Sequence, residues 1–123
     1  MTLYAFLAPL KTESEMNARG HWRVRDKRRK EQHHLVSLLM STHVPASIRF
    51  PVRVRFTRLS AGTLDDDNLR SALKFVRDAV AKHLRVDDGD IERIVWEYAQ
   101  AKAKRGEPGV YVEIESAKRG GSP

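Results

Sequence analysis

Apolar residues at helical spacing fill the middle of the chain and restrict the folds that it can adopt. They recur at the i, i+3, i+4 and i+7 positions that place side chains on one face of an α-helix. The positions are Leu69, Ala72, Leu73, Val76, Ala79, Val80 and Leu84. A helix with such a stripe must bury it against a sheet or a second helix. The opposite side carries Arg70, Lys74 and Arg77, which predicts a basic stripe on the surface.

A second pattern, with a period of two, precedes this helix. One set of alternate residues is apolar and consists of Ile48, Phe50, Val52, Val54 and Phe56. The other set consists of Arg49, Arg53, Arg55 and Thr57. Alternation of this kind predicts a half-buried strand, here with a basic outer face. Pro51 cannot donate a backbone hydrogen bond, so we expect it near the strand start or at a sheet edge.

The remaining elements complete a small α+β fold. We expect a strand over 3–9, a helix from about Asp26 to near Thr42, and strands over 93–100 and 109–116 that form a hairpin through the loop 101–109. The order β-α-β-α-β-β predicts two helices packed on a mixed β-sheet. The 123 residues suit a single small domain, over 1–116, followed by a polar and flexible C-terminal tail, 117–123.

The charge of the chain predicts a polyanionic partner. The formal net charge is +7 and the pI is about 10.1, for which nucleic acid is the simplest explanation. The chain has no cysteine, which excludes disulfides and zinc sites built on thiolates. The N-terminal run MTLYAFLAPLK has no basic n-region and is too short to cross a membrane. We expect a cytoplasmic protein without a membrane association or an organic cofactor.

A basic run between residues 19 and 30 is the candidate DNA-binding arm. It contains Arg19, Arg23, Arg25, Lys27, Arg28, Arg29 and Lys30 around Trp22. Cations at this density are typical of phosphate contacts, to which Arg70 and Arg77 of the later helix could add. The alternative is a solvated helix face with Trp22 in the core. Trp96 and Tyr98 are expected in the core rather than stacked on bases.

Aspartates lie on both sides of the amphipathic helix. Asp65, Asp66 and Asp67 precede it, and Asp67 or Asp66 could serve as the helix N-cap. Asp87, Asp88 and Asp90 follow it, where a turn around Gly89 would explain them. The helix is about 24 Å long, so the two groups meet only if the chain beyond it folds back. If they meet, their oxygen ligands suit Mg²⁺ or Mn²⁺.

Three short runs resemble a known family. They are Asp65-Asp66-Asp67-Asn68-Leu69, Asp78-Ala79-Val80 and Val86-Asp87-Asp88. Their spacing is similar to that of the RusA family of Holliday-junction resolvases, and the match is specific over 65–88. The resemblance implies that the protein is an endodeoxyribonuclease that acts in DNA recombination and repair and uses Mg²⁺ or Mn²⁺. It further implies that a homodimer resolves four-way DNA junctions by paired symmetric nicks, in a bacterium or a phage-infected host.

The resemblance also implies roles for individual residues. Asp65, Asp67 and Asp88 would be the catalytic, metal-binding carboxylates, and Asp87 would be an accessory metal ligand. The family's Pro-Pro-Ser-x-Asn stretch after the first strand is represented by Pro9 and Asn17, so Asn17 is assigned to DNA binding.

The catalytic lysine of the family has no exact counterpart. Its usual position is occupied here by Ser71. Lys74 keeps the family's four-residue spacing to Asp78, so we assign the role to Lys74, with Arg70 as the competing candidate.

Two other functions remain open from the sequence. In the first, the protein is a non-catalytic, basic DNA-binding protein whose aspartates only cap a helix and form a turn. In the second, it is a basic structural protein that coats RNA. Metal-dependent nicking of DNA would separate the resolvase from both.

Overall fold

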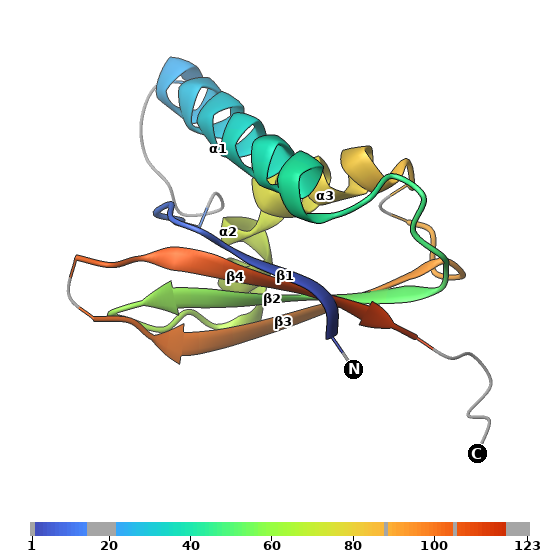
Figure 1. Cartoon of the computed structure of the whole chain (residues 1–123). Coiled ribbons are helices and arrows are strands. Elements are labelled where there is room, and N and C mark those ends of the chain that lie inside the picture. The colour runs from blue at the N-terminus through green and yellow to red at the C-terminus, as the bar shows by residue number, and fades with distance from the viewer. Residues whose placement is uncertain (1, 15–21, 88, 105, 118–123) are drawn as a thin grey trace.

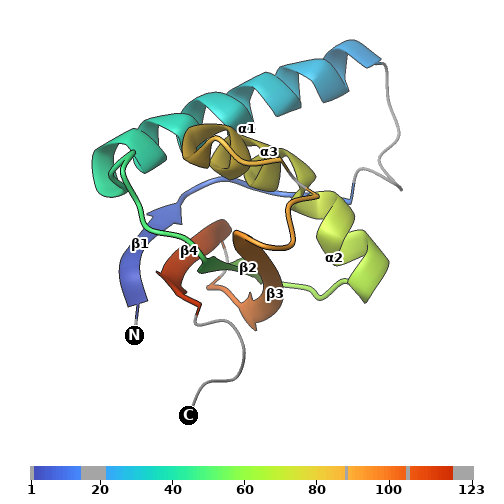
Figure 2. The same cartoon turned by 90° about the vertical axis from the view of Figure 1, so that its right-hand side faces the viewer.

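The computed structural model describes residues 2–14, 22–87, 89–104 and 106–117. The strands are β1 (Thr2–Ala8), β2 (Val52–Ser60), β3 (Ile94–Lys102) and β4 (Gly109–Ser116), and the helices are α1 (Trp22–His43), α2 (Asp66–Ala72) and α3 (Lys74–Leu84). Helices α1 and α3 cover one face of the sheet, and α2 lies on the β3 side (Figures 1 and 2). The expected α+β fold with a mixed sheet is confirmed.

Strand β2 lies inside the sheet, whose order is β1-β4-β2-β3. It pairs in parallel with β3 and antiparallel with β4, and β1 pairs antiparallel with β4. The expected hairpin of the last two strands is therefore wrong, because β2 separates them. A parallel pair needs a crossover connection, which α2 and α3 provide. The loop from β3 to β4 then spans only one intervening strand, or about 10 Å.

The alternation in β2 is confirmed. Val52, Val54 and Phe56 are fully buried beneath the helices. Pro51 stands directly before the strand, which agrees with its expected place near the strand start. Ile48 and Phe50 lie ahead of the strand and are partly buried against the core. The sequence thus predicted the faces of β2 correctly, although the strand begins later than the apolar alternation does.

The inward face of β2 continues to Arg58, which is only 8% exposed. Its Nε donates to the hydroxyl of Thr12 over 2.9 Å, and Nη2 donates to the carbonyl oxygen of Thr12 over 3.3 Å. Nη1 donates to the carbonyl oxygen of Gly62. Burial lowers the pKa of Arg58. These bonds attach the segment that follows β1 to the end of β2.

The amphipathic segment forms two helices rather than one. They meet at Leu73, whose backbone angles, φ −99° and ψ 5°, depart from those of an α-helix. Ala72, Leu73, Phe75 and Val76 are all buried. On a straight helix, with about 100° between successive residues, these four side chains would spread over about 160° of the circumference. The break lets α2 pack beside β3 while α3 packs between the sheet and α1.

Helix α1 extends over the expected region and begins earlier, at Trp22. Its buried residues are Gln32, Val36 and Met40, which are spaced by one helical turn. Leu38, an apolar residue of the same helix, is 57% exposed. Within the described part of the chain, no helix combines the length and the apolar character that a membrane crossing requires.

Gln32 is the one polar member of this buried row, and it supplies a stability test. It is 3% exposed, and neither Nε2 nor Oε1 has a hydrogen-bond partner. A buried amide without partners costs about 1–3 kcal/mol. We expect Gln32→Met, which keeps the length of the side chain, to raise the free energy of unfolding by about 1 kcal/mol in urea denaturation. A matched Glu31→Met change on the exposed face should leave the free energy of unfolding unchanged. A loss of stability in Gln32→Met would contradict the expectation.

Candidate functional site

The first aspartate of the acidic run is the N-cap of α2. Asp65 has an extended backbone, and its Oδ1 accepts hydrogen bonds from the backbone N and the Nδ2 of Asn68, each over 3.0 Å. The amide oxygen of Asn68 accepts a hydrogen bond from the hydroxyl of Ser14. Asp65 and Asn68 therefore fix the start of α2 to the segment after β1. The capping interpretation holds for this aspartate, which uses only one of its carboxylate oxygens.

Asp66 and Asp67 occupy the first turn of α2, and both are exposed. Within the described chain, neither carboxylate has a hydrogen bond or an ion pair with a side chain. Asp66 lines a depression of about 440 Å³ beside β3, together with Arg55 and Arg70. The helix dipole favours negative charge at this end. Uncompensated carboxylates are thus gathered at one place on a strongly basic protein.

The second acidic group forms a turn. Oδ1 of Asp90 accepts hydrogen bonds from the backbone N atoms of Glu92 and Arg93, over 3.1 and 3.0 Å. Oδ2 of Asp90 accepts a bond from Nε of Arg93 over 2.6 Å, and these contacts with Arg93 lower the pKa of Asp90. The backbone N of Asp90 donates to the carbonyl oxygen of Asp87, whose side chain is exposed. Asp88 lies outside the described residues, so its metal-binding role stays a prediction.

The two acidic groups lie at opposite ends of β3. Leu64, next to Asp65, exchanges two hydrogen bonds with the side chain of Gln100, over 2.8 and 2.7 Å. At the other end, the backbone N of Val52 donates to the carbonyl oxygen of Arg93. Arg93 and Gln100 are separated by roughly 23 Å of extended chain. The connection after α3 therefore does not bring Asp87 to Asp65, and Asp87 is misplaced as an accessory ligand of the same ion.

No group of three or more His, Asp and Glu side chains in the described residues could hold a metal ion. The donors at the start of α2 still fit one kind of ion. Mg²⁺ is commonly held by one or two carboxylates, waters and the phosphates of its substrate rather than by a complete protein cage. The second oxygen of Asp65 and the carboxylate of Asp67 are donors of this type.

Lys74 is separated from the other two cations of the expected stripe. It is exposed at the start of α3 and lines a pocket of about 360 Å³ between α1 and α3. We call this the α1–α3 pocket. Its lining consists of Trp22, Arg25, Asp26 and Arg29 of α1 and of Lys74, Phe75 and Asp78 of α3. The break at Leu73 thus directs Lys74 toward the basic arm.

Arg70 and Arg77 face the aromatic residues of β3 instead. The guanidinium carbon of Arg70 lies 5.2 Å from the ring centre of Tyr98, and that of Arg77 lies 4.6 Å from the ring centre of Trp96. Nη1 of Arg77 also donates to the Tyr98 hydroxyl over 2.6 Å. Both rings pack on Phe56, in agreement with their expected place at the core. The side chain of Arg77 is therefore held against Trp96 and Tyr98, whereas that of Arg70 remains exposed.

The basic arm forms the first half of α1, apart from Asn17 and Arg19, which lie outside the described residues. Four of its cations have acidic partners. The ion pairs are Lys27–Glu31 (3.9 Å), Arg28–Glu13 (3.2 Å), Arg29–Asp26 (2.7 Å) and Lys30–Asp26 (3.0 Å). Most of these pairs are exposed, and such pairs contribute about 0–1 kcal/mol, so phosphates can replace the carboxylates. Arg28 differs, because its side chain is only 17% exposed.

Trp22 does not lie in the core. It is 66% exposed at the first residue of α1, so the alternative that buried it is wrong. The guanidinium carbon of Arg23 lies 5.5 Å from its ring centre. The sequence offered one signal for this exposure. Trp22 stands among cations, and it lies outside the buried row of Gln32, Val36 and Met40.

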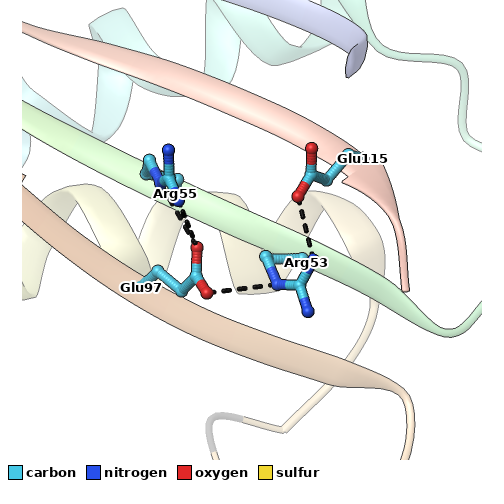
Figure 3. Close-up of polar contacts among 4 residues, drawn as sticks. All are labelled: Arg53, Arg55, Glu97 and Glu115. Carbon is cyan, nitrogen blue, oxygen red and sulfur yellow. Dashed lines mark hydrogen bonds and ion pairs between the residues drawn. The ribbon is translucent and has the colours of Figure 1, made fainter. Parts of the chain in front are cut away.

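The outer face of the sheet is not basic, contrary to expectation. Glu97 of β3 accepts ion pairs from Arg53 and Arg55, and Glu115 of β4 accepts one from Arg53, at distances of 2.9 to 3.1 Å (Figure 3). Arg53 lowers the pKa of Glu115. Glu113 lies opposite Arg55 in the register. The glutamates of the neighbouring strands therefore balance the arginines of β2.

No protein-family model and no curated protein matches the chain. The assignment to the RusA family stays a prediction, carried by the three runs between Asp65 and Asp88.

Proposed function

We propose that the protein is a Mg²⁺-dependent endonuclease that resolves branched DNA, in particular four-way junctions, by paired nicks. The observation that carries the proposal is the placement of Asp66 and Asp67 in the first turn of α2 of a protein with a net charge of +7, where neither carboxylate has an ion pair or a hydrogen bond with a side chain of the described residues. A protein that only bound DNA would gain nothing from such a patch, because it repels phosphate. A protein that cuts DNA needs carboxylates to hold its metal ion.

We assign the roles of the residues as the family resemblance implies them. Mg²⁺ bound to Asp65 and Asp67 would supply charge neutralisation at the scissile phosphate and a nucleophilic water. Lys74, exposed in the α1–α3 pocket, would contact the same phosphate group and stabilise the charge that develops on it. The cations of α1 would hold the neighbouring phosphates and orient the strand.

Paired nicks require two active sites, so the proposal includes a homodimer. The outer face of the sheet suits the contact between two copies. Its charged residues are two arginines and three glutamates, Arg53, Arg55, Glu97, Glu113 and Glu115. It also exposes Leu7, Val95 and Tyr111. Two strongly basic copies avoid mutual repulsion when they meet through this balanced face, which leaves the helical side for DNA. We place this dimer in the cytoplasm.

The direct test is incubation of the purified protein with a labelled four-way junction, with Mg²⁺ or with EDTA, beside a linear duplex of the same sequence. Symmetric nicks in opposing strands that require Mg²⁺ support the proposal, and light scattering should give the mass of a dimer. Equal cutting of the duplex would replace the resolvase with a general nuclease. Binding without any cutting, in Mg²⁺ or Mn²⁺, would reject catalysis.

The second candidate is a non-catalytic DNA-binding protein. Two observations favour it: Asp65 caps α2, and Asp90 closes a turn. In this case the remaining aspartates would only complement the helix dipole. The two candidates predict the same affinity for DNA but differ in the Mg²⁺ dependence of cutting.

Both candidates predict that the arm on α1 sets the salt dependence of DNA binding. We expect the combined change Arg25→Ala, Arg29→Ala and Lys30→Ala to reduce the slope of log K against log salt by about 2–3, since each duplex phosphate contact contributes about 0.9. Fluorescence anisotropy over a salt series measures this slope. Removal of Lys82, Lys102 and Lys104 together is the control, because it deletes the same charge elsewhere on the surface. Equal slopes for the two triple variants would show that the arm is only a solvated helix face.

A further inference from the structure

Trp22 is a large aromatic residue that the fold leaves uncovered. It is the first residue of α1 and exposes 66% of its surface, whereas Trp96, the other tryptophan of the chain, is half-buried against Phe56. Burial of an indole is strongly favourable, and helix α1 has an apolar row on which a tryptophan could have been accommodated. Trp22 instead leaves most of its surface accessible at the start of α1.

The surroundings of Trp22 are cationic. Arg23 lies against one side of the indole, with its guanidinium carbon 5.5 Å from the ring centre. Arg25, Arg29 and Lys74 line the α1–α3 pocket with it. Asp78 and Asp26 are the acidic residues of this pocket, and Asp26 is already bonded to Arg29 and Lys30, which lowers its pKa. An aromatic ring among positive groups presents a flat surface for a base and donors for the adjoining phosphates.

We propose that Trp22 is a stacking platform for an unstacked DNA base, with Arg25 and Lys74 as the contacts for the phosphates on either side of it. The inference rests on the proposed function and names the feature of branched DNA that the protein reads. Aromatic side chains stack on any base, independently of sequence, but only where the face of the base is accessible. A continuous duplex hides these faces, whereas a branch point, a gap or a single strand exposes them.

The same location connects the platform to the candidate chemistry. Lys74 borders the α1–α3 pocket and stands in the helical segment that begins with Asp65 to Asp67. A base held on Trp22 would fix the strand at Lys74. Selection of branched DNA and positioning of the phosphate would then be achieved by one contact.

Tryptophan fluorescence tests the platform directly, because the chain has only two indoles. In the Trp96→Phe variant, all indole emission comes from Trp22. We expect a single-stranded DNA oligonucleotide and a four-way junction to quench it strongly, and a linear duplex to quench it little. Trp22→Phe is the matched control; its emission, from Trp96, should not respond to any of these DNAs. DNA binding seen by anisotropy without quenching of Trp22 would overturn the proposal and leave the nuclease unaffected.

The affinity of the protein for DNA provides a second measurement, for which Trp96 does not have to be replaced. Trp22→Ala should weaken binding of the single-stranded oligonucleotide by about tenfold and change the duplex affinity by less than about twofold. Equal losses for both DNAs would reject stacking. A single-stranded RNA of the same sequence that bound about tenfold more tightly than the DNA would assign the platform to RNA and overturn the proposal. Mg²⁺-dependent cutting of the junction is scored separately, so a failed nuclease and a failed platform give different results.

Discussion

Replacement of Asp67 by asparagine is expected to abolish Mg²⁺-dependent cutting of a four-way junction while the junction still binds with equal or higher affinity. The change removes one carboxylate ligand of the metal and one negative charge that repels phosphate. Asp67 is exposed in the first turn of α2 and does not cap the helix, because Asp65 does. The loss of its favourable interaction with the helix dipole would cost only about 0.3–1 kcal/mol of stability.

Two measurements on the same preparations check this expectation. Single-turnover cleavage of labelled junction gives the rate, and anisotropy in Ca²⁺ or EDTA gives the affinity. Glu107→Gln is the control, since it neutralises an exposed carboxylate in the loop between β3 and β4. If Asp67→Asn cut at the wild-type rate, Asp67 would serve only the helix dipole and the proposed metal site would be wrong.

Lys74→Ala is expected to slow cleavage by about a hundredfold, while DNA affinity falls only by the small amount that one lost phosphate contact implies and thermal stability stays nearly unchanged. A positioned cation that stabilises transition-state charge contributes an effect of this size. The alternative role for Lys74, an ion pair with Asp78 one turn later, is not formed in the described structure. An exposed pair of this kind would in any case contribute only a few tenths of a kcal/mol.

Lys82→Ala, in the last turn of the same helix, is the matched control and should cut at the wild-type rate. Lys74→Arg should restore part of the activity, because it returns the charge without the same geometry. A wild-type rate for Lys74→Ala would transfer the assignment to Arg70, which is exposed beside Tyr98.

The strand faces could be predicted from the sequence because they are a local property. Side chains of a strand alternate, so the pattern of β2 identified Val52, Val54 and Phe56 as core residues. The neighbours of β2 are not a local property. The expected hairpin and the expected basic outer face both failed for this reason, since β3 and β4 flank β2 and place Glu97 and Glu115 beside its arginines.

The candidate site was predicted in part. The sequence suggested Asp67 or Asp66 as the N-cap, whereas the structure has Asp65 in that place and the other two in the first turn of α2. The direction in which the chain returns after α3 has no signature in the sequence, and it places Asp87 at the other end of β3. The break at Leu73 was not predicted either, because Leu69, Ala72, Leu73 and Val76 fit one continuous helical stripe. Because of that break, Lys74 lies beside the basic arm on α1, whereas Arg70 and Arg77 face the aromatic residues of β3.

The position of β4 has a consequence for how the protein folds during its synthesis. Strand β4 is synthesised after the other strands of the sheet, yet it lies between β1 and β2. On the ribosome, β2 and β3 can pair through α2 and α3, but β1 has no strand beside it until Gly109–Ser116 emerges. Until then only α1 can cover the inner side of β1, where His43 stacks on Phe6, and the backbone of β1 stays open to chaperones and proteases. The nascent chain can acquire its native sheet only when its final strand inserts between the two that were made first.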